Sequence, residues 1–280
     1  MTSDTSALKA EARAWRSTYL EPAIYWHLWL GCGAAVQAVF VLLTVGRSDG
    51  MALAYPLALG ISVAVYYNLY RGHFPARRRS VFVIGGSVLA CLLLVTTLDI
   101  PHAAMSTAML GAAGALTYAY TGLELRGTAF FAWGKPVLLA LVWACFTTAV
   151  PMALADSADV GLLLSRFAFY GALALAFDYR DRYADLRTGL RTISARWPRR
   201  ALAAVAVVLL GASAAAPVYV DARYATAWLY PLSAASVLGA AWVSLAFRQN
   251  PPPGHAYELY LDGLLILPAP LAFMLLLLPR

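Results

Sequence analysis

Runs of apolar residues, each about as long as a membrane-spanning helix, alternate with short polar segments along this chain. A helix that crosses the hydrocarbon core of a bilayer needs about 20 mostly apolar residues. Nine runs come close to this length, at 23–45, 51–70, 80–98, 102–120, 132–151, 160–177, 201–220, 224–246 and 258–278. The pattern therefore predicts an all-α membrane protein, built as a bundle of nine transmembrane helices.

The predicted helices follow one another too closely to leave room for a soluble domain. No Gly/Ser-rich linker and no low-complexity tract separates them, so residues 23–280 are expected to form one transmembrane domain. Residues 1–22 are polar and of helical composition, and they lack the apolar core and cleavage site of a signal peptide. They are predicted to lie at the cytoplasmic membrane surface.

The composition agrees with a membrane location, because 61% of the residues are hydrophobic and only 12% are charged. In a nine-span protein, the N-terminal segment and every second loop lie on one side, which here holds 17 of the 21 Lys and Arg residues. Positive residues are retained in the cytoplasm, so the N-terminus and the active face are predicted to be cytoplasmic in a bacterial-type inner or plasma membrane. The chain has a net charge of +7, and its positive residues are concentrated on this face, which predicts contact with membrane lipids or an anionic substrate, and not with nucleic acid.

The most polar stretch, FDYRDRYADLRTGLRTISARWPRR, begins at Phe177 and follows the sixth apolar run. If the sixth helix continues through it, Asp178, Asp181 and Asp185 share one helix face. Like charges in this arrangement repel one another, and Mg²⁺, which binds carboxylates together with phosphate oxygens, would relieve the repulsion. The alternative interpretation is an ordinary solvated loop, in which the seven arginines of the stretch neutralise the aspartates.

The order DYRDRYADLRTGLRT resembles the second Asp-rich motif of the UbiA superfamily of intramembrane prenyltransferases. In that motif an Asp series runs into a basic residue, a Gly and an Arg/Lys-Thr pair. The matching positions here are Asp178, Asp181, Asp185, Gly189, Arg191 and Thr192. The family also has nine transmembrane helices, with this motif on the cytoplasmic side after the sixth. The segment from Tyr118 to Pro151, in which Tyr120 precedes Arg126, is similar to the family's connection between the fourth and fifth helices and the helix after it.

The resemblance implies a prenyltransferase, an enzyme that acts on a prenyl diphosphate and a lipophilic acceptor. It implies that Asp178, Asp181 and Asp185 are catalytic and hold Mg²⁺. It also implies substrate contacts, which we assign to Tyr120, Arg126, Arg182 and Arg191.

The first Asp-rich motif of the family, which follows the second helix, is degenerate in this chain. The equivalent stretch VYYNLYRGHFPARRR keeps Asn68 but has Arg71 and no carboxylate. A guanidinium fork fits phosphate without a metal, so we expect Arg71 to contact the diphosphate directly as a catalytic residue. Asn68 lies one turn earlier and is expected to face the same substrate.

Asp262 lies about one turn inside the ninth apolar run, and Glu258 precedes it by one turn. An ionisable residue in a membrane span is a functional candidate, so Asp262 is predicted either to contact substrate or to pair with a loop arginine. Two other functions remain open for the whole chain. One is a membrane terpene cyclase, and the other is a non-catalytic protein of the same fold that binds an isoprenoid, carotenoid or quinone.

Overall fold

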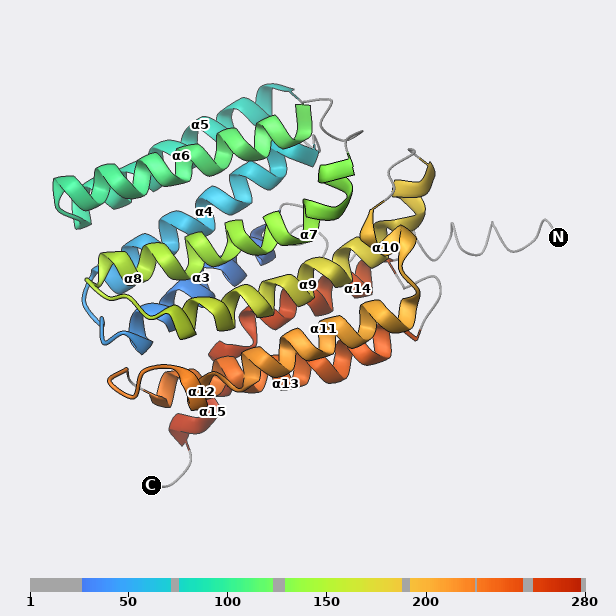
Figure 1. Cartoon of the computed structure of the whole chain (residues 1–280). Helices are drawn as coiled ribbons and strands as arrows, with labels where there is room; N and C mark the ends of the chain where they lie inside the picture. The colour runs from blue at the N-terminus through green and yellow to red at the C-terminus, as the bar shows by residue number, and fades with distance from the viewer. Residues whose placement is uncertain are drawn as a thin grey trace.

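The computed structural model describes residues 27–71, 76–122, 129–187, 192–224, 226–248 and 254–277, and every regular element in these ranges is a helix (Figure 1). The predicted surface segment at 1–22 lies outside the described residues. The same holds for Arg126 and Arg191.

Within the described residues, each predicted run is helical over most of its length. The first four are α3 (Leu28–Thr44), α4 (Met51–Arg71), α5 (Ala76–Thr97) and α6 (Ile100–Gly122). The fifth is a continuous rod of α7 (Ala129–Ala144), the π-helix η2 (Cys145–Ala149) and α8 (Val150–Leu154). The remaining helices are α9 (Val160–Arg187), α10 (Ile193–Arg196), α11 (Arg199–Ala214), α12 (Ala216–Tyr219), α13 (Thr226–Ala246), α14 (Gly254–Ile266) and α15 (Pro268–Leu277).

Prolines interrupt two of the predicted runs. A proline has no backbone N–H to donate and fits best in the first turn of a helix. The seventh run accordingly divides into α11 and α12 just before Pro217, and the ninth divides into α14 and α15 at Pro268. These runs are therefore pairs of shorter helices rather than single rods.

Three helical stretches are long and apolar enough to cross a membrane, judged by length and composition, and they cover Gly134–Leu154, Val160–Tyr183 and Ala227–Ala246. Three further apolar stretches are shorter, at Leu28–Thr44, Leu53–Tyr67 and Val83–Thr97. The described part of the chain is thus all-helical and suited to a membrane.

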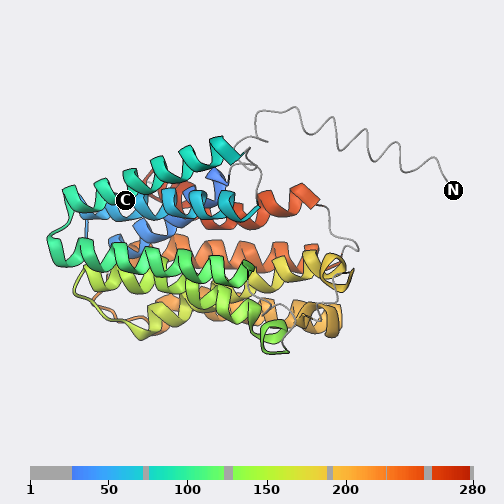
Figure 2. The same ribbon diagram turned by 90° about the horizontal axis from the view of Figure 1, so that it is seen from above.

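The helices run back and forth between two ends of the bundle (Figure 1). One end carries α10 and the starts of α7 and α14, and the opposite end carries α8, α12 and the turn between α5 and α6. Figure 2 shows the same separation from above. The end of α9, the short helix α10 and the start of α11 carry much of the arginine-rich stretch. They lie at the first of these two ends, which we call the α10 end.

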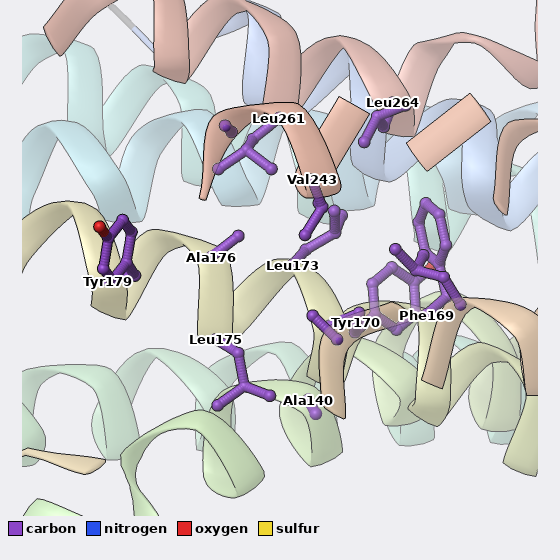
Figure 3. Close-up of a cluster of buried hydrophobic side chains, with 14 of the residues drawn as sticks. Ala140, Phe169, Tyr170, Leu173, Leu175, Ala176, Tyr179, Val243, Leu261 and Leu264 are labelled. Carbon is purple, nitrogen blue, oxygen red and sulfur yellow. The ribbon is translucent and has the colours of Figure 1, made fainter. Parts of the chain in front are cut away.

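Helix α9 lies at the centre of the bundle and packs between α7 and α11. Its residues from Ala168 through Ala176 are buried on all sides, as expected for a helix that is apolar all round. Figure 3 shows its apolar side chains reaching toward Leu261 of α14 on one side and Ala140 of α7 on the other. This core fixes where each polar residue of α9 can lie.

Helices α3 and α4 approach each other closely at two glycines. A Cβ atom on Gly31 would lie 2.5 Å from the carbonyl oxygen of Gly60, and one on Gly60 would lie 2.8 Å from that of Gly31. Small residues of this kind allow backbones of membrane helices to touch.

Candidate functional site

Asp178 is buried where three elements meet at the α10 end. Its side chain is 1% exposed, and its Oδ1 forms an ion pair with Nζ of Lys135 on α7 at 2.9 Å. The hydroxyl of Ser194 on α10 lies 2.7 Å from Oδ2 and 2.9 Å from the carbonyl oxygen of Asp178. A buried carboxylate requires such partners, and these contacts hold α7 and α10 against α9.

Asp181 lies one turn later and has a different environment. Its carboxylate accepts two hydrogen bonds from the guanidinium of Arg180, at 2.7 Å from Nε and 3.1 Å from Nη2. The Asp181 side chain is 40% exposed. Solvent therefore screens this pair, whereas the Asp178 charge is shielded from water.

The prediction that the sixth helix continues past Phe177 is confirmed, since α9 extends to Arg187. The alternative of a solvated loop is wrong for Asp178, which is helical and buried. Asp178 and Asp181 each have a cationic partner of their own, Lys135 and Arg180. Asp185 lies on α9, but its side chain is outside the described residues.

A pocket of about 390 Å³ opens next to Asp178 at the end of α9. Its lining comes from α9, α10 and the start of α11, namely Tyr179, Arg182, Ser194, Ala195, Trp197, Pro198 and Arg199. Ser194 belongs both to the lining and to the Asp178 contacts. The volume lies within the range of about 300–1,000 Å³ that is usual for small-molecule sites.

The pocket lining combines cationic and aromatic side chains. The Arg182 guanidinium lies over the rings of Tyr179 and Tyr183, at 5.1 and 4.7 Å from their centroids. Arg199 donates to the carbonyl oxygen of Arg248 at 3.2 Å. Arg182 and Arg199 give the pocket two guanidinium groups, and no carboxylate is among its lining residues. This chemistry suits an anionic group.

The other predicted site residues are only partly described. Asn68 and Arg71 lie at the end of α4 and Tyr120 near the end of α6, but their side chains are outside the described residues. Asp262 is partly buried on α14, which packs against both α3 and α9. Its predicted role stays a prediction.

The two described carboxylates of the predicted Mg²⁺ site are engaged by side chains of the protein in this arrangement. Asp178 is engaged by Lys135 and Ser194, and Asp181 is engaged by Arg180. Within the described ranges, no three His, Cys, Asp or Glu side chains gather closely enough to hold a metal ion. The Mg²⁺ site that the resemblance implies for Asp178, Asp181 and Asp185 therefore stays a prediction.

Sequence reasoning did not assign a role to Lys135 or Ser194. Lys135 had a usable signal, since it is an ionisable residue within the fifth apolar run, and such residues mark functional or paired positions. Ser194 carried no such signal, because serine is common in polar segments and its contact with Asp178 is made by the turn into α10.

The comparisons with known proteins add no relative. No protein-family model matches the chain, and a search of curated proteins found no match either.

Proposed function

We propose that this chain is an integral membrane prenyltransferase of nine spans, with its α10 end in the cytoplasm, that acts on a prenyl diphosphate and a lipophilic acceptor. The observation that supports this proposal best is the pocket at the end of α9, where Arg182 and Arg199 line the same space as Tyr179 and Trp197. The diphosphate would bind the two guanidinium groups, and the prenyl chain would extend along the aromatic rings toward the apolar bundle.

The cationic and aromatic side chains of the pocket have roles in prenyl transfer. The bond between the allylic carbon and the diphosphate oxygen breaks, and both electrons leave with the diphosphate. Arg182 and Arg199 offset the negative charge that develops on the leaving group. The ring face of Trp197, which is partly exposed, stabilises the allylic cation, while Tyr179 is buried and holds Arg182 over its ring. An electron-rich carbon of the acceptor then forms the new bond and releases its proton to water.

A second candidate function is isoprenoid binding without catalysis. It is favoured by the pair of Lys135 and Asp178, because a carboxylate that the resemblance assigns to a metal is here buried and neutralised. A binder would use the same pocket for the head group of the lipid. The two candidates differ only in whether the bond between the prenyl group and the diphosphate is cleaved.

The test uses the full chain in detergent and radiolabelled farnesyl diphosphate, with and without Mg²⁺. Binding should be at least tenfold tighter than for farnesol, and Arg182→Gln or Arg199→Gln should each weaken it about tenfold or more. Arg200→Gln is the matched control, since Arg200 is exposed at the same end but does not line the pocket.

Release of inorganic diphosphate, measured in bacterial lipid extract as the source of acceptors, then separates the two functions. Release that depends on Arg182 supports prenyl transfer. Tight binding without release supports the binder. Equal affinity for farnesyl diphosphate and farnesol would reject both.

A further inference from the structure

Arg166 is the largest side chain that is fully buried in the described part of the chain, with 1% of its surface exposed. It lies on α9, six residues after Val160, which puts it about 9 Å along the helix axis from that end. This depth falls within the apolar stretch Val160–Tyr183. A guanidinium stays protonated in proteins, so Arg166 carries its positive charge inside the bundle.

Within the ranges that the structure describes, no carboxylate forms an ion pair with Arg166. Its Nη2 donates to Oε1 of Gln37 at 2.7 Å, and its guanidinium carbon lies 4.3 Å from the ring centroid of Phe169. Neither Nε nor Nη1 has a hydrogen-bond acceptor within the ranges that the structure describes. Asp159 lies nearly two turns away and accepts backbone N–H groups from Leu162 and Asp221.

These contacts offset little of the cost of burying a charge. A ring face contributes roughly 0.5–2 kcal/mol, whereas an isolated charge within a membrane helix costs about 2.5 kcal/mol or considerably more. A water molecule would satisfy the remaining N–H groups but would bring no negative charge, whereas an anion would do both.

The polar network around Arg166 includes two places where helices are irregular. The Tyr170 hydroxyl lies 3.3 Å from Gln37 Oε1 and 2.6 Å from the hydroxyl of Thr147, which belongs to the π-helix η2. Gln37 Nε2 donates to the carbonyl oxygen of Leu265 at 2.6 Å, just before the break between α14 and α15. Single π-turns are frequent at functional sites, and broken helices form ion and substrate sites in membrane proteins.

We propose that Arg166 is the centre of a buried anion site between α3, α9, η2 and the end of α14. The site takes a compact monoanion, either a free ion such as chloride or formate, or the carboxylate of a lipophilic molecule. The anion accepts hydrogen bonds from Nε and Nη1 of Arg166 and neutralises its charge. Because these donors are sealed from solvent, the anion enters when η2 or the α14–α15 break opens.

This site is separate from the pocket at the α10 end. Asp178 follows Arg166 by twelve residues on α9, which corresponds to about 18 Å along the helix. The inference therefore does not rest on the proposed function.

The experiment compares thermal unfolding of the full chain in detergent across matched sodium salts. Gluconate, which is too large for the site, is the reference, and chloride, formate and decanoate are the probes, with decanol as the control for the decanoate chain. At a hundredfold excess over Kd, a ligand of the native state should raise Tm by about 5–10 °C, and the rise should saturate. A response to chloride or formate identifies a free ion, and a response to decanoate alone identifies a lipophilic carboxylate.

A single substitution supplies the anion internally. Gln37→Glu would put a carboxylate where Oε1 now lies, 2.7 Å from Nη2, so its response to anions should be lost, although the variant also loses the hydrogen bond from Nε2 to the Leu265 carbonyl oxygen. Arg166→Met should also lose the response. A wild-type Tm that is the same in all four salts overturns the proposal, and so does a Gln37→Glu variant that keeps the full wild-type response.

Discussion

The ammonium nitrogen of Lys135 lies 2.9 Å from a carboxylate oxygen of Asp178, and this pair joins α7 to α9 beside the pocket. Both side chains lie within stretches apolar enough to cross a membrane. The contact is thus an ion pair at low exposure, where loss of one partner is costly.

Lys135→Met should destabilise the protein by about 3–5 kcal/mol, because Asp178 would keep a buried charge without its partner. The measurement is the midpoint of unfolding by sodium dodecyl sulfate in mixed micelles. The double variant Lys135→Met/Asp178→Asn should recover most of the loss, since neither charge remains. A single variant as stable as the wild type would show that the pair contributes nothing.

Ser194→Ala should cost about 1.5–3 kcal/mol, the usual range for a hydrogen bond to a charged group. Because Ser194 also lines the pocket, the same variant should weaken binding of farnesyl diphosphate. Ser244→Ala is the control, since the Ser244 hydroxyl donates only within its own helix, to the Ala240 carbonyl oxygen. Equal effects of the two substitutions would argue against a special role for Ser194.

Gly60→Ala should destabilise the protein by about 1–3 kcal/mol, because the added Cβ would lie 2.8 Å from the Gly31 carbonyl oxygen and force α3 from α4. Gly111→Ala, where a Cβ meets nothing within 4 Å, should be neutral or stabilise by up to about 1 kcal/mol. Unfolding midpoints of the two variants give the comparison directly. Similar midpoints would mean that α3 and α4 separate at little cost.

Arg71→Lys should weaken prenyl diphosphate binding, and Arg71→Ala should reduce it about tenfold to a hundredfold, which corresponds to a loss of about 1.5–3 kcal/mol. This prediction rests on the sequence, where Arg71 lies at the position that the resemblance gives to the first Asp-rich motif. Arg78→Ala in the same basic segment should matter little. Equal losses at both positions would reduce the segment to a membrane anchor and favour the non-catalytic function.

The topology prediction rests on the distribution of Lys and Arg. A reporter fused after Arg280 should be extracytoplasmic, and one inserted near Pro198 should be cytoplasmic, as read by compartment-specific enzyme activity. Both reporters on one side of the membrane would rule out nine spans.

The helices could be predicted from the sequence because their signal is local. Each apolar run is bounded by polar residues, and the run at 160–177 even continues as helix through the Asp-rich stretch to Arg187. The breaks before Pro217 and at Pro268 also had a local cause, which the count of apolar residues ignored. The π-helix η2 had no such signal in its composition.

The partners of the site residues could not be predicted, because they come from distant parts of the chain. Asp178 contacts Lys135 of α7, and nothing in either local segment specifies that pairing. In the sequence, Arg166 was only one of four positive residues away from the side that is predicted to be cytoplasmic. Its contact with Gln37 spans 129 positions and becomes visible only when α3 and α9 are packed together.

The hydrogen bond from Gln37 to the Leu265 carbonyl oxygen also has a consequence for biosynthesis. Leu265 is synthesised 228 residues after Gln37. The Gln37 amide therefore has no access to this acceptor until all the intervening helices have been made. A chain that stops before α14 leaves this amide nitrogen without its acceptor in an apolar environment, which membrane-embedded polar groups avoid. The arrival of the last helix pair is therefore the event that completes the interior around Arg166.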